Sequence, residues 1–298
     1  MKEEIISGVK LERKNDLDLI IVDSNFICYR AMLSMMGLSH EEHATGVIFG
    51  FLREIQKLAE EFEGSKQFAF AWDSRKSYRR DIYPDYKKRT QIEDPEMEDI
   101  LRSGKPQFDE IRLNVLPKLG FKNNFIQTGL EADDIIAYIA RKNVERFEQI
   151  YIASSDEDLF QILYDNISIY NPREKKIYTQ NDFINEKGIT PDQWSWIKAV
   201  AGCNSDNIKG IAGVGEKTAI KFLKKELKTG SKKYNDILEF NPNFNLSLVE
   251  LPHKRTFPIP LIEDELDFSI FEGLCLDYGF NSFLKKDVYK KWEAILCP

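Results

Sequence analysis

The sequence of 298 residues has little histidine and little cysteine, and neither residue type occurs in a metal-binding spacing. The three histidines lie outside the acidic motifs described below, at His40, His43 and His253. The four cysteines are scattered and form no CxxC pair: Cys28, Cys203, Cys275 and Cys297. This pattern argues against a zinc site and a disulfide framework, and it is typical of reduced thiols in a cytoplasmic protein.

Long apolar runs are missing as well. No stretch approaches the roughly 20 apolar residues of a membrane span, and residues 1–16 lack the apolar segment of a signal peptide. The net charge of −7 argues against a protein that coats nucleic acid through overall positive charge. The hydrophobic content of 42% is that of a globular protein with a core. We therefore expect a soluble protein without a membrane partner.

Three short β-rich runs alternate with helical stretches. The runs cover residues 17–23, 67–73 and 149–158, and each of them ends at aspartate. Apolar periodicity predicts helices in residues 46–62, 108–119 and 133–143. Strands that alternate with helices predict an α/β fold with a parallel sheet. Right-handed crossovers place the carboxyl ends of such strands at one edge, where these folds bind ligands.

Acidic residues gather at that predicted edge. The strands deliver Asp23, Asp73, Asp156 and Asp158, and a helix that begins nearby carries Glu131, Asp133 and Asp134. Singly, such residues are common in turns and in the first turn of a helix. Two carboxylates 4 Å apart, however, repel by about 4 kcal/mol at an effective dielectric constant of 20, so the cluster must bind protons or cations. Oxygen ligands favour Mg²⁺ or Mn²⁺, and aspartates around two such cations are typical of phosphoryl hydrolysis.

Basic and aromatic side chains are interleaved directly after Asp73. They are Arg75, Lys76, Tyr78, Arg79, Arg80, Tyr83, Tyr86, Lys87, Lys88 and Arg89. This combination suits single-stranded nucleic acid, because it neutralises phosphates and offers rings for stacking. The alternative interpretation is a solvated basic loop. The acidic run in residues 93–99 is interpreted as a solvated helix start and not as a metal site.

Gly213 and Gly215 form a glycine hairpin that leads into a helix predicted for residues 216–225. Glycines let the backbone approach a ligand closely, and the free N–H groups of a helix N-terminus bind phosphate. The motif is not a P-loop, because GxxxxGK(S/T) is absent. Farther along, four prolines in residues 241–262 predict loop or extended chain, and Phe268, Phe271, Phe280 and Phe283 predict packing.

Five segments together resemble the 5′-nuclease family, which includes flap endonucleases, the 5′-nuclease domains of bacterial DNA polymerases and the phage 5′-exonucleases. They are IIVDSNFICYR (20–30), AWDSRKSYRRDIYPDYKKRT (71–90), LEADDIIAYIA (130–140), IASSDEDLFQIL (152–163) and GCNSDNIKGIAGVGEKTAIKFL (202–223). Their order is that of the family, and the chain is most similar to the phage members, also called phage ribonuclease H. The resemblance implies a PIN-like (Rossmann-like) parallel-sheet core, a helical arch and a helix–three-turn–helix (helix-hairpin-helix) DNA-binding region.

The resemblance also implies two groups of metal ligands. The first metal group would contain Asp23, Asp73, Glu131, Asp133, Asp134 and Asp156. The second metal group would contain Asp156, Asp158 and Asp206. The family usually reads Gly-Asp-x-x-Asp-Asn where this chain reads Gly202-Cys203-Asn204-Ser205-Asp206-Asn207. Cys203 therefore replaces an aspartate of the second metal group, and we expect weaker Mg²⁺ binding there, because sulfur is a soft ligand.

Contacts to nucleic acid follow from the same resemblance. Lys87 matches the arch lysine that contacts the scissile phosphate, and Arg30 is implied as a second catalytic residue. Further DNA contacts are implied for Arg79, Lys88, Arg89, Gly213, Gly215, Lys217 and Thr218. The implied cofactors are two Mg²⁺ or Mn²⁺ ions, with K⁺ at the glycine hairpin as an additional expectation. The implied partners are DNA or RNA–DNA with 5′ ends, flaps or forks, together with replication proteins.

Two domains are expected, a nuclease core in residues 17–198 with an arch at about 75–110, and a DNA-binding region with a C-terminal extension in residues 199–298. The favoured function is a monomeric, structure-specific, metal-dependent 5′ nuclease in the cytoplasm, or in the host cytoplasm if the chain is phage-encoded. The alternative is a branched-DNA-binding protein of this fold whose catalysis is weakened. An aspartyl-phosphate phosphatase is disfavoured, because Asp23-Ser24-Asn25 lacks the second aspartate.

Overall fold

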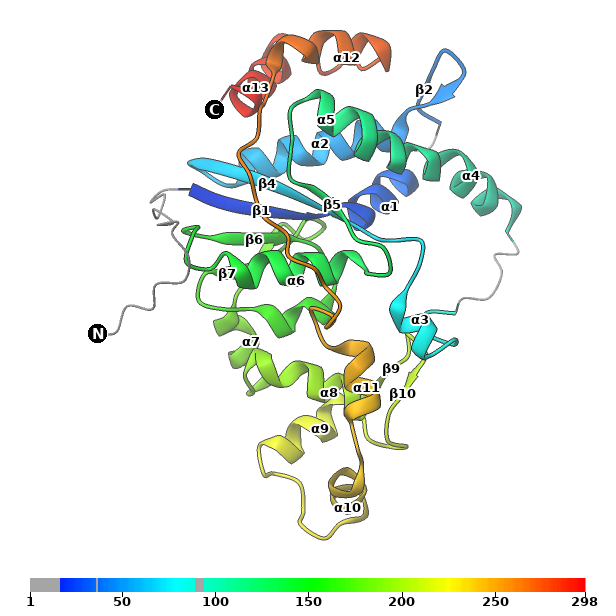
Figure 1. Cartoon of the computed structure of the whole chain (residues 1–298), viewed down its shortest axis with the longest axis vertical. Coiled ribbons are helices and arrows are strands. Elements are labelled where there is room, and N and C mark those ends of the chain that lie inside the picture. Colours follow the sequence, from blue (N-terminus) through cyan, green and yellow to red (C-terminus); the bar gives the residue numbers. More distant parts are fainter. Residues whose placement is uncertain (1–16, 36, 89–93, 298) are drawn as a thin grey trace.

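The computed structural model describes residues 17–35, 37–88 and 94–297 (Figure 1). A six-stranded sheet with the order β5–β4–β1–β6–β7–β8 forms its centre. The strands are β1 (Leu17–Asp23), β4 (Ser65–Trp72), β5 (Asn124–Ile126), β6 (Ile150–Ala153), β7 (Ile167–Asn171) and β8 (Lys176–Tyr178). Only the pair β7–β8 within this sheet is antiparallel. The α/β fold with a mainly parallel sheet is therefore confirmed.

Strands β1 and β4 are buried on both faces, which explains their continuous apolar sequences. In β1, Ile20 and Val22 point into the core on one face, whereas Leu19 and Ile21 point into the core on the other. The register of β1 with β4 lets both strands end at the same edge of the sheet. The chain segments that follow these two strands consequently start side by side.

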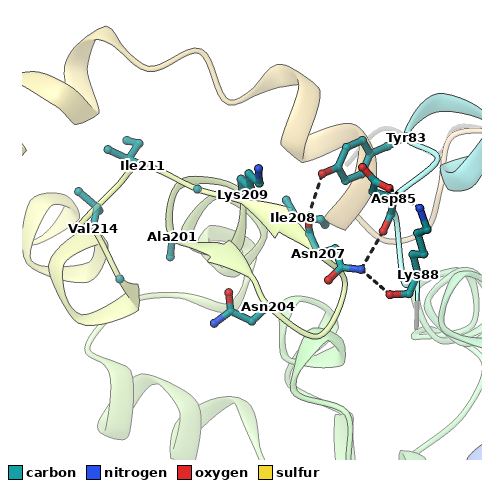
Figure 2. A pocket seen from close by; sticks show the side chains of 13 residues that line it. Tyr83, Asp85, Lys88, Ala201, Asn204, Asn207, Ile208, Lys209, Ile211 and Val214 are labelled. Atoms are coloured by element: carbon teal, nitrogen blue, oxygen red, sulfur yellow. Dashed lines mark hydrogen bonds and ion pairs between the residues drawn. The ribbon is translucent and has the colours of Figure 1, made fainter. Parts of the chain in front are cut away.

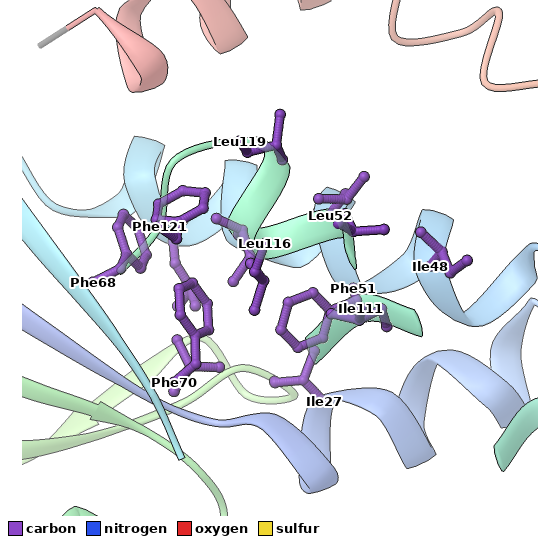
Figure 3. Close-up of a cluster of buried hydrophobic side chains, with 14 of the residues drawn as sticks. Ile27, Ile48, Phe51, Leu52, Phe68, Phe70, Ile111, Leu116, Leu119 and Phe121 are labelled. Atoms are coloured by element: carbon purple, nitrogen blue, oxygen red, sulfur yellow. The ribbon is translucent and has the colours of Figure 1, made fainter. Parts of the chain in front are cut away.

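One face of the sheet is covered by α1 (Ser24–Ser34), α2 (Gly46–Glu61) and a helical stretch formed by α4 (Pro95–Glu110), the π-helical η1 (Ile111–Val115) and α5 (Leu116–Lys118). Figure 3 shows the core beneath these helices, in which Phe70 of β4 faces Phe51 and Phe121. The ring centroids are 5.9 Å apart for Phe51 and Phe70 and 5.3 Å apart for Phe70 and Phe121. Each such buried ring stabilises the fold by about 1.5–3 kcal/mol.

The C-terminal segment completes this same face, at the top of Figure 1. It contains η4 (Phe268–Ile270), α12 (Phe271–Asp277) and α13 (Lys286–Leu296). Phe271, Phe280, Phe283 and Trp292 are buried against the helices of the first face, and Phe268 packs on them. The packing role predicted for the four phenylalanines is confirmed.

The other face carries α6 (Ala132–Lys142), η2 (Glu157–Ile162), α7 (Gln180–Lys187), η3 (Pro191–Gln193) and α8 (Trp194–Ala201). Below them in Figure 1 lie α9 (Glu216–Leu223) and α10 (Lys232–Glu239), and α11 (Asn243–Val249) lies beside α8. The short strands β9 (Gly202–Cys203) and β10 (Ile208–Lys209) pair between α8 and α9, next to α3 (Tyr78–Ile82). A second short hairpin pairs β2 (Ser39–His40) with β3 (His43–Ala44). Residues from both predicted domains share the buried cluster on this face, and the division at residue 198 stays a prediction.

Two predictions of local structure were wrong in extent. The helix predicted for residues 108–119 begins earlier, at Pro95, and Gly104 lies inside it. Glycine lets α4 approach α1, because a Cβ at Gly104 would lie 2.3 Å from Sδ of Met32. Asp94 caps this helix by accepting from the backbone N–H of Glu96 at 3.0 Å, as expected for a solvated acidic start.

Residues 241–262, predicted as loop or extended chain, contain the helix α11. Pro242 immediately precedes its first turn, where proline does not interrupt helical hydrogen bonds. The chain then runs without regular structure past the sheet to η4, directly before α12 (Figure 1). Asn123 anchors it, because its amide donates to the carbonyl of Ile262 at 2.8 Å and accepts from the Ile262 N–H at 3.0 Å. In the described ranges, no helix combines the length and apolar character needed to cross a bilayer.

Candidate metal centre and nucleic-acid interface

Six aspartates line one cavity of about 520 Å³ at the carboxyl edge of the sheet. Asp23 ends β1, Asp73 follows β4 and Asp156 follows β6. The other three come from helical and turn segments: Asp133 from α6, Asp158 from η2 and Asp206 from the turn between β9 and β10. The structure thus brings together six of the eight predicted metal ligands. Parallel strands that end at one edge explain the three that follow strands.

Hydrogen bonds orient the carboxylates of Asp23 and Asp73 in the first metal group. Asp23 accepts from the N–H of Phe26 at 3.0 Å and from the hydroxyl of Ser154 at 2.9 Å. Asp73 accepts from the N–H of Ala132 at 2.8 Å. These bonds use the free N–H groups at the starts of α1 and α6, so the two helix ends are attached to the rim.

The cluster carries more negative charge than its surroundings neutralise. Burial, together with the nearby carboxylates of Asp73 and Asp156, raises the pKa of Asp23 to about 7. Burial is also the main cause that raises the pKa of Asp133 well above its usual range, and it raises the pKa of Asp73 and Asp206. The folded protein without cations therefore holds protons that an unfolded chain would release.

The melting temperature in EDTA is expected to fall as the pH rises from about 5.5 to about 8, because the folded state binds more protons than the unfolded state in this window. Excess Mg²⁺ at the upper pH should restore stability, since a ligand at 100 times its Kd adds about 2.7 kcal/mol to the folded state. Calorimetry across this pH range, with and without Mg²⁺, measures both effects. Melting curves that coincide in EDTA and in Mg²⁺ would contradict a shared cation site.

Lys87 reaches the cluster from the arch base, which we define as residues 78–88. Its Nζ lies 2.7 Å from Oε2 of Glu131, and its side chain lines the aspartate cavity. Burial lowers the pKa of Lys87, but Glu131, Asp206 and Asp133 raise it by more, so the ammonium stays charged. The hydroxyl of Tyr86 donates to the same Glu131 oxygen at 3.1 Å. Glu131, the seventh predicted metal ligand, is thus placed beside the cavity with Lys87 as its partner.

The second metal group includes a thiol. Asp158, Cys203 and Asp206 each offer one ligand atom, and these three atoms lie within 4.8 Å of one another. The Cys203 sulfur lies 3.0 Å from Oγ of Ser205, and burial raises the pKa of the thiol. The residue that stands in place of an aspartate therefore faces the two carboxylates of this group.

Lys198 also lines the cavity, and the sequence did not single it out. Its Nζ lies 3.0 Å from Oδ1 of Asp158 and 3.8 Å from Oε1 of Glu216. Burial lowers the pKa of Lys198, but Asp158 raises it by more, which keeps the ammonium charged. No sequence signal distinguishes this lysine from others on amphipathic helices, because its contact with Asp158 spans two elements.

Two polar residues of the rim, Ser154 and Asn25, were missed as well. Oδ1 of Asn25 accepts from the backbone N–H of Asp73 at 2.9 Å, which ties the start of α1 to the end of β4. Oγ of Ser154 donates to Asp23 and accepts from the N–H of Asp156 at 3.2 Å. Asn25 comes soon after β1 and Ser154 directly after β6, and both strands end at this cluster. Their positions after these strands were the sequence signal that could have identified them.

Arg79 and Asp134, predicted as a DNA contact and a metal ligand, are bound to each other. The two guanidinium–carboxylate distances are 2.6 and 2.8 Å, and the side chains are 2% and 0% exposed. Arg79 also donates to the carbonyl of Leu248 at 2.8 Å, and Asp134 accepts from the N–H of His253 at 2.8 Å. Each charged group is buried and already has its partners, and neither residue lines the aspartate cavity. Their predicted roles in binding DNA and metal stay predictions.

Arg30, predicted to be catalytic, is placed away from the aspartate cavity. Its guanidinium lies 3.2 Å from Oε1 of Glu54 and donates to the carbonyl of Pro172 at 3.2 Å. Phe26 and Tyr29 are the α1 side chains that line the cavity, together with Asn25 at the helix start. A residue one position after Tyr29 points about 100° away on a helix, which explains why Arg30 does not line the cavity. Its catalytic role stays a prediction. Arg89 lies outside the described residues.

The arch base is attached to the β9–β10 hairpin (Figure 2). The Asn207 amide donates to the carbonyls of Asp85 at 3.0 Å and Lys88 at 2.9 Å, and the Tyr83 hydroxyl donates to the Asn207 carbonyl at 3.1 Å. The backbone N–H of Lys87 donates to the carbonyl of Asp206 at 3.0 Å. The hairpin therefore positions the lysine beside the second metal group.

A second cavity, of about 730 Å³, lies between the arch base and the glycine hairpin. Lys88, Gly213 and Gly215 all line it. Gly213 has a left-handed backbone (φ 76°), which favours glycine, and a Cβ there would meet open space. Lys217 and Thr218 follow in the first turn of α9. The predicted DNA contacts of the hairpin thus lie together, on the surface next to the arch base.

Comparison with known proteins gives the following matches. Residues 18–188 match the family model described as 5′-3′ exonuclease, N-terminal resolvase-like domain. A 5′-3′ exonuclease of Buchnera aphidicola subsp. Schizaphis graminum (strain Sg) is 33% identical over 213 residues, which are 70% of each chain. A 5′-3′ exonuclease of Aquifex aeolicus (strain VF5) is 34% identical over 210 residues, which are 70% of this chain and 69% of the relative.

Solved structures share the fold. The bacteriophage T5 5′-exonuclease with bound zinc ions has a TM-score of 0.64 and 22% identity, and the match covers 79% of this chain and 90% of that one. The catalytic core of Rad2 in complex with a DNA substrate has a TM-score of 0.53 and 16% identity, and the match covers 90% and 89%. These likenesses confirm the predicted PIN-like fold. With a family model that matches more than half of its length and relatives above 30% identity, the chain belongs to the 5′-3′ exonuclease family.

Proposed function

We propose that this protein is a structure-specific, divalent-metal-dependent 5′ nuclease. It would hydrolyse phosphodiesters in DNA, or in RNA paired with DNA, at 5′ ends, flaps or forks. The observation that carries the proposal is the single cavity in which six aspartates lie beside the charged Lys87. A phosphate entering this cavity needs cations between itself and the carboxylates, because the direct encounter would be repulsive.

The residues of the first metal group fit a hard divalent cation. Asp23, Asp73, Asp133 and Asp156 offer oxygen atoms only, and their raised pKa values reflect buried negative charge that a cation would neutralise. We assign Mg²⁺ or Mn²⁺ to this first metal group. When bound, such cations act as Lewis acids toward the phosphate and lower the pKa of water.

The other polar groups orient and hold the nucleic acid. Lys87 presents a positive charge at the edge of the cavity, where negative charge grows on the phosphate during hydrolysis. Lys88, the glycine hairpin and the start of α9 would bind duplex phosphates, as backbone N–H groups and lysines commonly do. We also propose that K⁺ binds at the glycine hairpin, and that α8 and α9 with this hairpin form a helix-hairpin-helix element that binds DNA. We further propose that the protein acts as a monomer and contacts replication proteins at forks. This would take place in the cytoplasm of a cell, or of the host if the chain is phage-encoded.

A second candidate is a branched-DNA-binding protein with weak catalysis. Cys203 within the second metal group favours it, because a thiol there removes one carboxylate. Lys198 also favours it, because its ammonium already contacts Asp158.

A 5′-labelled single flap, incubated in Mg²⁺ and in EDTA, separates the two candidates. We expect cleavage that requires Mg²⁺ or Mn²⁺ and that is lost in Asp156→Asn, a variant that keeps the size of the side chain. A blunt duplex without a 5′ flap should be cut more slowly. Tight binding of the flap without cleavage in either cation would favour the DNA-binding protein.

Cys203→Asp should lower the Mg²⁺ concentration for half-maximal cleavage, because a carboxylate is a better Mg²⁺ ligand than sulfur. Mn²⁺ should support cleavage by the unmodified protein better than Mg²⁺ does, since Mn²⁺ is higher in the affinity order. The measurement is a Mg²⁺ titration of cleavage for both proteins. Cys297→Asp, at an exposed position, is the matched control and should leave the titration unchanged. Coincident curves for Cys203→Asp and the parent would show that residue 203 does not act on the cation.

A further inference from the structure

We propose that the second metal group of this chain is a mixed thiolate–carboxylate site for a thiophilic divalent cation such as Zn²⁺, Co²⁺ or Cd²⁺, with Cys203 as a direct ligand. The proposal deepens the proposed function and rests on it, since it concerns the cation of the same centre. Asp158 and Asp206, whose ligand oxygens lie within 4.8 Å of the sulfur, supply the other protein ligands, whereas Asp156 stays with the first metal group. Solvent or a phosphate oxygen completes the coordination.

The spacing of the three ligand atoms suits a small tetrahedral cation. They lie within 4.8 Å of one another. With Zn–S near 2.3 Å and Zn–O near 2.0 Å, the sulfur–oxygen edge of a tetrahedron is about 3.5 Å. Side-chain movements of about 1 Å, well within the range of rotamer adjustment, would close the site. Octahedral Mg²⁺ keeps several water molecules and gains little from sulfur.

The hairpin holds the sulfur in position. Cys203 lies in β9, where it pairs with Ile208 of β10, and only 6% of the residue is exposed. The Ser205 hydroxyl, 3.0 Å from the sulfur, can donate to a thiolate and so act as an outer partner of the ligand. The sulfur is buried close to the carboxylates of Asp158 and Asp206, so a cation bound by these two residues would lie near it.

The three ligands would oppose the charge of the cation. The thiol proton leaves to solvent when the sulfur binds the cation, which gives three negative charges on Asp158, Cys203 and Asp206. The cation contributes two positive charges, and the ammonium of Lys198, 3.0 Å from Asp158, contributes one. Asp156 adds further negative charge near Asp206, and Glu216 lies 3.8 Å from the ammonium of Lys198.

The other cysteines offer no comparable surroundings. Cys28 and Cys275 are buried in the hydrophobic core on the first face of the sheet, and Cys297 is exposed. Cys297 is therefore the thiol that could compete for an added metal, and it supplies the control.

Cadmium titration of the full-length, EDTA-treated protein tests the proposal without relying on activity. We expect the ultraviolet thiolate-to-cadmium charge-transfer band to appear and to saturate at one Cd²⁺ per chain. Cys203→Ser and Cys203→Asp should both lose the band, whereas Cys297→Ser should keep it. In competition with a chelator, Cys203→Ser should weaken Zn²⁺ binding by at least about the 100-fold that loss of an outer partner can cost. Excess Mg²⁺ should leave the band in place.

Three outcomes would overturn the proposal: no band in the parent protein, a band that persists in both Cys203 variants, or a band that disappears in Cys297→Ser. Cys203→Asp guards against a folding failure, because it introduces the carboxylate typical of the family. The flap assay in Mg²⁺ keeps the two proposals apart. Cleavage without a charge-transfer band would contradict the thiolate site but not the nuclease function. A charge-transfer band without cleavage in any cation would support the thiolate site and contradict the nuclease function.

Discussion

Lys87→Ala should slow single-turnover cleavage of a bound flap by about 100-fold, the scale expected when one preorganised charge is removed from a reacting centre. The Lys87 ammonium lies at the edge of the aspartate cavity, and its backbone is fixed by the bond to Asp206. The positive charge stabilises the transition state most, because negative charge grows on the phosphate there. The affinity for the flap should therefore fall much less than the cleavage rate. Rapid-quench kinetics with enzyme in excess measures the rate apart from affinity.

Lys88→Ala is the matched comparison for Lys87. The Lys88 side chain is 71% exposed, and its ammonium contacts Asp85 at 3.3 Å, outside the aspartate cavity. Loss of one phosphate contact among many should weaken substrate binding and reduce its salt dependence. The rate at which bound substrate is cleaved should change little. If Lys87→Ala loses affinity while bound substrate is cut at the normal rate, Lys87 serves only to dock the substrate.

Arg79→Met should lower the free energy of unfolding by about 3–5 kcal/mol, because it leaves the carboxylate of Asp134 buried without its partner. The guanidinium holds the pKa of Asp134 below its usual range, although burial alone would raise it. Without Arg79 the folded-state pKa should instead rise above the unfolded value. The variant should therefore recover part of the lost stability as the pH falls and Asp134 takes up a proton. Urea unfolding at neutral and mildly acidic pH measures this.

The control for Arg79 is Arg75→Met in the same segment. Arg75 is 92% exposed and pairs with Asp109 at 2.9 Å, so its removal should change stability by less than about 1 kcal/mol. Arg79→Met combined with Asp134→Asn should be more stable than the sum of the single effects predicts, since the pair interacts directly. Equal stability of the parent and Arg79→Met would show that the buried pair does not hold the arch base to α6.

The sequence by itself determined the sheet and its acidic rim. The runs that became β1, β4 and β6 were recognisable because central parallel strands are apolar on both faces. Each run ends at aspartate, and the handedness of the crossovers sends all such ends to one edge. Asp23, Asp73 and Asp156 could therefore be placed together without any knowledge of packing. The change at Cys203 was visible too, because it interrupts an otherwise matching motif.

Tertiary structure decided which way individual side chains point. Asp133 and Asp134 are neighbours on α6, so they project about 100° apart, and only one can face the cavity. Packing of the arch base against α6 turned Asp134 inward to Arg79, 55 positions away, and left Asp133 at the cavity. Lys198 likewise reached Asp158 only because α8 packs beside η2. A local pattern fixes where a residue lies along its helix or strand, whereas its partner depends on contacts between segments distant in the chain.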